Sequence, residues 1–223
     1  MVIPSAAPLL LEKDNHLYSL NMVRGISVYN EELIEIGGEE YRSFTPKRSK
    51  LAAVIKKGIT PDILENAKML YLGAANGTTV SHISDLMPDG KIFAVEISSR
   101  TFRDLLELAK SRPNIFPILA DAMKPETYRY IVDHVDIIYQ DIAQKGQAAI
   151  FLANAKSYLK KNGIAYLMVK ANCIDSTKKA DLIYREIRTQ MTSAGFLIRN
   201  ALELDPYQKD HMAFIMKENG LQR

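Results

Sequence analysis

Three polar residues in the second half of the chain are of types that suit proton transfer. Asp141 follows one short apolar run, Lys170 closes the next, and His211 lies just before a later one. A carboxylate, an amine and an imidazole can each accept or donate a proton, or hold a hydroxyl group for reaction. Each also has an ordinary structural role, Asp141 as a helix cap, Lys170 as a strand-end lysine and His211 as a structural histidine.

A second group of residues suits the binding of a nucleoside. The segment Tyr71–Thr79 contains Gly73 and Gly77 and leads from an apolar run into a helical pattern. Small residues at such a turn let backbone N–H groups approach a ligand. Ala75 and Thr78 stand where the dinucleotide motif G-x-G-x-x-G has its second and third glycines, so a pyrophosphate is disfavoured. Alone, the segment fits a structural tight turn equally well.

Two acidic residues strengthen the binding interpretation. Glu96 ends the next apolar run, about 20 residues downstream, where a carboxylate can accept two hydrogen bonds from a ribose diol. Asp121 follows the third run and can accept a hydrogen bond from the exocyclic amine of a purine. Open α/β sheets bind ligands at the carboxyl ends of their strands. The turn and the two acids together therefore predict an adenosine pocket.

These residues require a sheet that brings the ends of several strands together. From Lys68 onward, apolar runs alternate with helical patterns, which indicates a mostly parallel sheet covered by helices on both faces. We expect strands at Met69–Leu72, Ile92–Glu96, Ile115–Leu119, Val135–Tyr139 and Ile164–Lys170, and helices at Ser99–Lys110, Gln147–Lys161 and about Lys178–Ala194. Pro117 places the third strand at an edge, because proline cannot donate to a ladder. The last strands, Phe196–Leu204 and Met212–Met216, are joined by a short turn and must pair antiparallel.

The first 45 residues have a different pattern. Short runs such as His16–Met22 and Ile26–Tyr29, with Gly37-Gly38 after them, indicate a small antiparallel β unit. Thr45-Pro46 then opens a basic helix that extends to Gly58. We therefore expect a small β domain over residues 1–45 and an α/β domain over residues 46–223.

The stretch Tyr41–Pro61 carries no acid and six cations, namely Arg42, Lys47, Arg48, Lys50, Lys56 and Lys57. The net charge of the whole chain is only +3, so this basic character is local. A cationic patch of this kind suits a polyanion such as nucleic acid. The structural alternative is a solvated helix face.

Composition limits the class of protein. The 223 residues are 47% hydrophobic and 25% charged, which is typical of a globular protein and excludes disordered, collagen-like and disulfide-scaffold chains. Cys173 is the single cysteine, so no intramolecular disulfide forms and a reducing cytoplasm is expected. Met1–Leu11 lacks the cationic start of a secretory leader, and no apolar run approaches the ~20 residues of a membrane helix.

Several motifs in order resemble those of the fibrillarin family. They are Tyr71–Val80, Asp141–Gln144, Val169–Thr177 and Lys209–His211, and Tyr41–Ala53 is similar to the family pattern Y-R-x-W-x-P-x-R-S-K-L-A-A. The resemblance covers nearly the whole chain. It differs at Phe44, where the family usually has tryptophan, at Ile97, where phenylalanine is frequent, and at Lys145-Gly146, where Pro-Asp is common. None of these differences removes a charged residue of the expected site.

The resemblance implies a fold, an activity and partners. The fold would be a Rossmann-like class I methyltransferase with a mostly parallel seven-stranded sheet and an antiparallel last strand, preceded by the small antiparallel β domain. The activity would be S-adenosylmethionine-dependent 2′-O-methylation of rRNA, with tRNA as a further candidate substrate, inside a box C/D guide ribonucleoprotein. Partners would be guide and target RNA, a Nop-domain scaffold protein and a kink-turn-binding ribosomal-type protein. The glycine-arginine-rich extension of eukaryotic members is absent, so we expect an archaeal-type cytoplasmic protein.

The resemblance also assigns residues by position. The cofactor would be bound by Gly73, Ala75, Gly77, Thr78, Thr79, Glu96, Ile97, Asp121, Ala122, Asp141, Ile142, Ala143 and Gln144. The catalytic set would be Lys50, Asp141, Lys170 and His211, and no metal is expected. Lys170 would be the general base if it is neutral. If it is protonated, it would orient the ribose hydroxyl while Asp141 carries more of the base's role, and Lys50 and His211 would position the ribose and its phosphates.

Two other functions stay open at this point. A nicotinamide-dependent dehydrogenase would use the same strand, turn and helix with Glu96 on the ribose, although the missing glycines argue against it. A non-catalytic subunit of the ribonucleoprotein would keep the fold for assembly alone, and the retained charged set argues against that.

Overall fold

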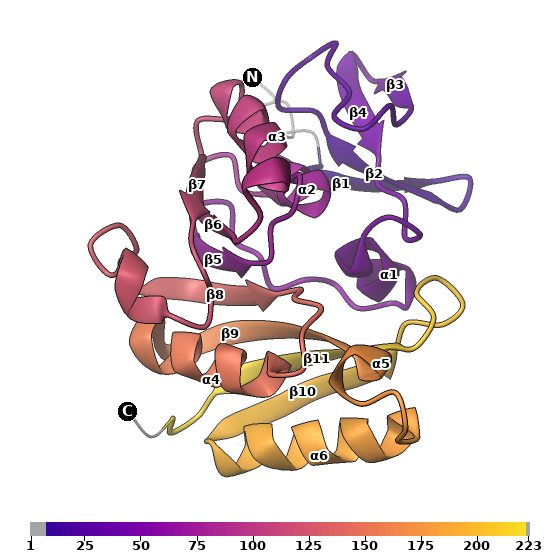
Figure 1. Cartoon of the computed structure of the whole chain (residues 1–223). Helices are drawn as coiled ribbons and strands as arrows, with labels where there is room; N and C mark the ends of the chain where they lie inside the picture. Colours follow the sequence, from indigo (N-terminus) through magenta and orange to yellow (C-terminus); the bar gives the residue numbers. More distant parts are fainter. Residues whose placement is uncertain (1–7, 222–223) are drawn as a thin grey trace.

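The N-terminal part of the chain forms a small antiparallel sheet, as predicted. The computed structural model describes residues 8–221, so most of Met1–Leu11 lies outside it (Figure 1). The strands are β1 (Leu10–Lys13), β2 (His16–Leu20), β3 (Leu33–Ile36) and β4 (Glu39–Ser43), in the order β1-β2-β4-β3. The predicted run Ile26–Tyr29 forms no strand, because the Glu31 carboxylate accepts hydrogen bonds from the N–H groups of Val28 and Tyr29.

The second sheet confirms the predicted fold class. Its strands are β5 (Lys68–Leu72), β6 (Lys91–Glu96), β7 (Ile115–Leu119), β8 (Val135–Gln140), β9 (Leu159–Lys170), β10 (Phe196–Glu203) and β11 (His211–Glu218). The order is β10-β11-β9-β8-β5-β6-β7, and β11 runs antiparallel to both of its neighbours while the other pairs are parallel. Pro117 lies in β7, which is an edge strand as expected.

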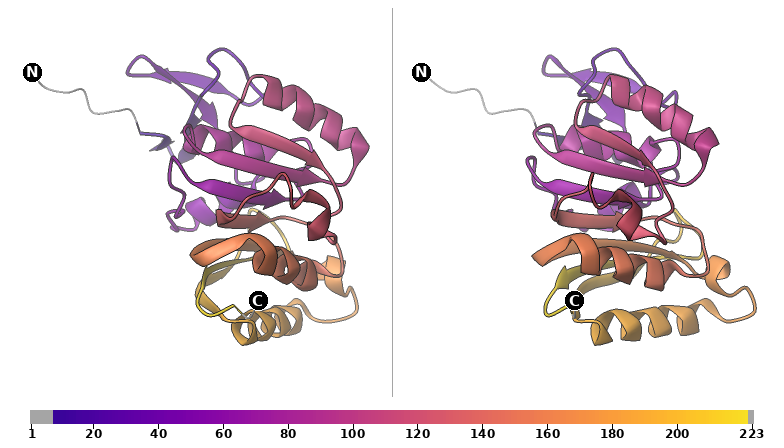
Figure 2. Two further views of the ribbon diagram at one scale, coloured as in Figure 1. Left: turned by 90° about the vertical axis from the view of Figure 1, so that its left-hand side faces the viewer. Right: turned by 60° about the vertical axis from the view of Figure 1, so that its left-hand side comes forward.

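Helices cover both faces of this sheet (Figure 2). The helices α1 (Lys50–Lys56), α2 (Thr78–Leu86) and α3 (Ser99–Lys110) pack on one face; α4 (Gln147–Tyr158) and α6 (Ala180–Ser193) pack on the other, with the 3₁₀ turn η1 (Pro125–Tyr128) and the short α5 (Ala171–Ile174). Successive residues of a strand point to opposite faces, so Met69 and Tyr71 of β5 join the first layer and Leu70 and Leu72 the second. No helix within residues 8–221 is long and apolar enough to cross a membrane.

Two helices are shorter than the sequence pattern indicates. The predicted helix over Gln147–Lys161 ends at Tyr158, because Leu159 already pairs with Val135 of β8. The basic helix starts at Lys50 rather than at Thr45-Pro46, since Ser49 is its N-cap and accepts a hydrogen bond from the Ala52 N–H. Each difference moves a boundary and leaves the order of elements unchanged.

A buried ionic network joins the small sheet to the large one. Arg42 of β4 is fully buried, with Nε 2.6 Å from a Glu31 oxygen and Nη1 2.9 Å from Oδ2 of Asp85 on α2. Arg112 Nη1 lies 2.5 Å from the other Asp85 oxygen. The expectation that Arg42 belongs to an exposed cationic patch is therefore wrong, because its charge is compensated inside the protein.

His82 of α2 lies beside this network as a neutral ring. Burial lowers its pKa well below the usual value, and the charges of Arg42 and Arg112 lower it further. Its ring nitrogens hydrogen-bond to the hydroxyl groups of Ser19 and Tyr29, both at 2.7 Å. Phe44 stacks on the ring at 4.1 Å between centroids, so the residue that differs from the family's tryptophan has an interior packing role.

Candidate active site

Lys50 and Asp141 form an ion pair at the carboxyl edge of the large sheet. The Lys50 ammonium lies 2.8 Å and 2.7 Å from the two Asp141 oxygens, and the side chains are 18% and 22% exposed. Lys50 is the first residue of α1 and Asp141 follows β8, so residues 91 positions apart in sequence meet here. The pair can compensate the Asp141 charge while leaving lone pairs of the carboxylate for other donors.

Contacts from two other segments fix the start of α1. Thr79 Oγ1 on α2 donates a hydrogen bond to Ser49 Oγ at 3.1 Å. The Gln208 side-chain amide, in the loop before β11, donates to the Pro46 carbonyl at 2.8 Å. Ser49 in turn caps α1, so the backbone that carries Lys50 is held from both sides.

Lys170 and His211 face each other on neighbouring antiparallel strands, β9 and β11. His211 Nδ1 lies 2.7 Å from the Lys209 carbonyl; a carbonyl can only accept, so Nδ1 carries the proton and Nε2 is the free acceptor of the neutral ring. Burial lowers the pKa of His211, which favours this neutral form; the Lys209 carbonyl and Asp141 oppose the shift, while Lys50 and Lys170 reinforce it. The charges of Lys50, Asp141 and Lys170 thus all act on His211.

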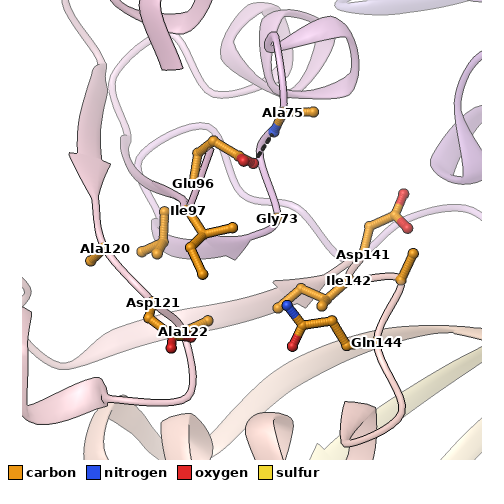
Figure 3. Close-up of a pocket in the computed structure, with 12 residues that line it drawn as sticks. Gly73, Ala75, Glu96, Ile97, Ala120, Asp121, Ala122, Asp141, Ile142 and Gln144 are labelled. Carbon is orange, nitrogen blue, oxygen red and sulfur yellow. Dashed lines mark hydrogen bonds between the residues drawn. The ribbon is translucent and has the colours of Figure 1, made fainter. Parts of the chain in front are cut away.

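A pocket opens beside these residues, at the carboxyl ends of β5, β6, β7 and β8. Its cavity volume is about 210 Å³, and its wall is formed by Gly73, Ala75, Val95, Glu96, Ile97, Ala120, Asp121, Ala122, Asp141, Ile142, Ala143 and Gln144. The loop after β8 supplies Asp141 through Gln144, on the side opposite Asp121 (Figure 3). We call Lys50, Asp141, Lys170 and His211 the charged cluster. Asp141 therefore belongs both to the pocket wall and to the charged cluster.

Glu96 has a fixed orientation at the pocket floor. One of its oxygens accepts a hydrogen bond from the Ala75 N–H at 2.8 Å (Figure 3). The other accepts one from the Ser98 N–H at 2.7 Å. An ionised carboxylate has about four acceptor positions, so two remain for a ligand with paired hydroxyl groups. The geometry fits the predicted contact with a ribose diol.

Gly73 allows the backbone after β5 to approach the loop after β8. It has a φ of +86°, and a Cβ placed on it would overlap the carbonyl of Asp141. Any larger residue would push Asp141 away from its position. Ala75, two residues on, has a φ of +49° and directs its N–H at Glu96.

Most of the cofactor residues expected from sequence line this pocket, but the start of α2 does not. Gly77, Thr78 and Thr79 are absent from the wall; Thr78 Oγ1 donates to Asn76 and Thr79 to Ser49. Val95 and Ala120 line the pocket and were not expected. In the sequence, these two residues stand out only because they precede Glu96 and Asp121. That position indicates the end of a strand, but it does not tell whether the residue faces the pocket.

The arrangement defines a class of protein. Only β11 is reversed in the seven-stranded sheet, and the pocket lies where β5 borders β6 and β8, which is the Rossmann-like fold of class I methyltransferases. Solved methyltransferases that are 10–16% identical to the chain match it with TM-scores of 0.54–0.56. Similarity at that level shows the shared fold.

The chain belongs to the fibrillarin family, whose sequence model matches residues 9–220. It is 48% identical over 203 residues to the fibrillarin-like rRNA/tRNA 2′-O-methyltransferase of Sulfolobus acidocaldarius, which covers 90% of this chain and 88% of the relative. The crystal structure of Aeropyrum pernix fibrillarin with natively bound S-adenosyl-L-methionine is 41% identical, with a TM-score of 0.84 over 90% of this chain and 88% of that one. Fibrillarin in a fibrillarin/Nop5p complex is 42% identical, with a TM-score of 0.88 over 95% and 98%.

Proposed function

We propose that this protein is an S-adenosylmethionine-dependent RNA 2′-O-methyltransferase, the catalytic subunit of a box C/D guide ribonucleoprotein that acts on rRNA and tRNA. The observation that carries the proposal is the meeting of Lys50, Asp141, Lys170 and His211 beside a pocket whose floor is Glu96. The relative from Sulfolobus acidocaldarius carries this activity in its name, and the solved fibrillarin from Aeropyrum pernix holds the cofactor.

The residues of the pocket fit the cofactor. Glu96 offers free acceptor positions for the ribose hydroxyls, and Asp121 lies on the adjacent wall, where it can accept from the adenine amine. When bound, S-adenosylmethionine supplies an electrophilic methyl group. Asp141 lines the pocket and pairs with Lys50, so it would hold the cofactor beside the charged residues.

The charged cluster then positions the ribose hydroxyl and accepts its proton. Holding the acceptor in line for displacement supplies up to ~7 to 11 kcal/mol in favourable systems. Lys170, when neutral, would take the proton of the 2′-hydroxyl as the oxygen–methyl bond forms, while the methyl–sulfur bond breaks and the sulfur leaves as a neutral thioether. His211 offers Nε2 as an acceptor that orients the ribose, and the Lys50 charge lies where a phosphate can approach.

The partners in this proposal are RNA and protein. Guide RNA pairs with the target and selects the nucleotide, so this chain needs to recognise mainly A-form shape and backbone. The solved fibrillarin/Nop5p complex supports a Nop-domain scaffold as the protein that docks the enzyme; a kink-turn-binding protein completes the particle. We place this particle in the cytoplasm, where the free thiol of Cys173 would stay reduced.

The test is methyl transfer in a reconstituted particle. The protein is combined with guide RNA, the Nop-domain and kink-turn-binding proteins, target RNA and cofactor carrying a tritiated methyl group. Label should appear at a single 2′-oxygen and move when the guide sequence is changed. Reduced nicotinamide in the same assay should neither bind nor react. Particles that assemble normally but never transfer label would instead show a structural subunit.

Replacing Glu96 with alanine should weaken cofactor binding about 10- to 100-fold. The reason is that hydrogen bonds to a charged group contribute about 1.5–3 kcal/mol each when they are removed. Isothermal titration with S-adenosylmethionine measures the change, and the exposed residue Glu107, substituted in the same way, is the control. An unchanged Kd in the Glu96 variant would remove this carboxylate from the cofactor site.

Neutralising Lys47 and Arg48 together should weaken the RNA-dependent rate and reduce its salt dependence. Both are exposed beside Lys50, and the Arg48 guanidinium lies 5.6 Å from the Tyr29 ring centroid, which limits its freedom. Removing one cation from a phosphate reduces the slope of log affinity against log salt by roughly one. Binding measured across salt concentrations checks this, with Lys110 changed to glutamine as the control. Parallel slopes for variant and parent would show that this part of the basic stretch does not contact RNA.

A further inference from the structure

Gln147 contacts the backbone of Lys170 at two points. Its side-chain Nε2 donates to the Lys170 carbonyl and its Oε1 accepts from the Lys170 N–H, both at 3.3 Å. Gln147 is fully buried at the first position of α4. The last pair between β8 and β9 is Gln140 with Leu167, so Lys170 lies beyond the end of that ladder. On this side of Lys170, the Gln147 amide makes the two backbone hydrogen bonds that a neighbouring strand would otherwise make.

A second buried amide connects this contact to Asp141. Gln140, the residue immediately before Asp141, is fully buried and donates from Nε2 to the Gln147 carbonyl at 2.7 Å. The backbone segments that carry Asp141 and Lys170 are thus bridged by two side-chain amides, one after the other. Each of these hydrogen bonds pairs a buried polar group, so breaking one leaves that group without a partner. The Gln140 Oε1 is buried without a partner among the described residues, so Gln140 is held through its Nε2 alone.

The direction of the contact also determines how Lys170 meets His211. The Lys170 N–H and carbonyl both point toward Gln147, while the next N–H, that of Ala171, points toward β11 and donates to the Asp210 carbonyl. Lys170 and His211 are therefore a non-hydrogen-bonded antiparallel pair, in which Cα atoms lie about 4.5 Å apart and the side chains are closest. Rotation of the Lys170 backbone would separate the two side chains.

We propose that Gln147 is a positioning residue that holds Lys170 against His211 and at a fixed spacing from Asp141. This inference rests on the proposed function for its effect on rate, but its structural content is independent of it. Gln147 is fully buried and is not part of the pocket wall. It acts on the reaction only through the backbone of Lys170.

The test compares two Gln147 variants with a matched control. Gln147→Met keeps length and apolar volume and removes both hydrogen bonds, so the single-turnover rate in the particle should fall about 100-fold, as expected for a displaced reactive group. The Kd values for cofactor and RNA should stay within about twofold, because Gln147 is fully buried and lies outside the pocket wall. Asn114→Leu is the control; Asn114 is a buried amide that bonds the Ser84 and Met87 carbonyls away from the site. It should lose stability but keep the parental rate.

Gln147→Glu provides a rescue that a purely structural role would not show. A neutral carboxyl has one donor and one acceptor, as the amide does, whereas the carboxylate has only acceptors. The rate of this variant relative to the parent should therefore rise as the pH falls, while the ratio for Gln147→Met stays flat. If the methionine variant does not fold, this pH-dependent ratio alone decides the question.

Hydrogen exchange separates this inference from the proposed function. Exchange of the Lys170 amide should be at least tenfold faster in Gln147→Met than in the parent, whether or not the protein transfers methyl groups. If the particle that contains the unsubstituted protein transfers no methyl groups, the proposed function is wrong, but the exchange result at Lys170 still holds. Four results would each overturn the inference. Two concern Gln147→Met: amide exchange at Lys170 as slow as in the parent, or a rate equal to that of the parent. The others are a fall in rate in Gln147→Met no greater than that in Asn114→Leu, and a relative rate of Gln147→Glu that does not change with pH.

Discussion

A particle that carries Lys170→Met is expected to transfer methyl groups at least ~100-fold and up to ~10,000-fold more slowly than the parent, the range that general-base catalysis supplies. Methionine keeps the length of the side chain and cannot accept a proton. Cofactor affinity should be unchanged, since Lys170 is not in the pocket wall. The measurement is a single-turnover rate with saturating RNA and cofactor, and Lys161→Met, an exposed lysine at the other end of β9, is the control.

The pH dependence of that rate distinguishes the two roles open to Lys170. If it is the base, the rising limb of the parental profile disappears in the variant. If it only orients the hydroxyl, the limb persists at a lower rate and Asp141 is the proton acceptor. A variant with the rate and profile of the parent would exclude Lys170 from the chemistry.

Replacing Asp85 with alanine should lower the free energy of unfolding by about 3–5 kcal/mol, because it leaves buried cations without their partner. Asp85 is 2% exposed, lies between Arg42 and Arg112, and also accepts from the Ser19 hydroxyl and the Met22 N–H. A natural domain has about 5–15 kcal/mol of stability, so this loss takes much of it. Urea denaturation followed by circular dichroism measures the change.

The matched control is an exposed ion pair. Glu107 and Lys110 on α3 lie 2.7 Å apart with side chains about 70% exposed, and Glu107→Ala should cost less than about 1 kcal/mol. The network also crosses the domain boundary that we propose after residue 45, because Arg42 is on one side and Asp85 on the other. A cost at Asp85 no greater than that at Glu107 would mean that the ion pairs of Asp85 do not stabilise the contact between the two sheets.

Local patterns in the sequence predict most of the fold. The strand Ile115–Leu119 and the helix Ser99–Lys110 have the predicted bounds, and Pro117 predicts the edge position, because these depend on residues that are near in sequence. The end of α4 is not predictable in this way. Leu159 continues the helical spacing of Ala155 and Tyr158, and only its pairing with Val135 places it in β9.

The candidate site is predictable in part for the same reason. Asp141, Lys170 and Glu96 lie at the ends of strands, and the carboxyl ends of parallel strands meet at one edge of the sheet. Arg42 is indistinguishable from Lys47 in sequence, yet its partner Asp85 lies 43 residues away and is found only in the folded protein. Gln147 gives no signal at all, because a glutamine at the start of a helix is ordinarily a solvated residue.

The two outer strands of the large sheet bear on how the protein behaves at high concentration. An open sheet edge is a template on which another copy can add a strand, which leads to aggregation. On β7, Pro117 removes one donor from that template, and on β10 the register shift between Ile198 and Asn200 disrupts it. Crowded copies of the enzyme can therefore lie side by side without their sheets merging.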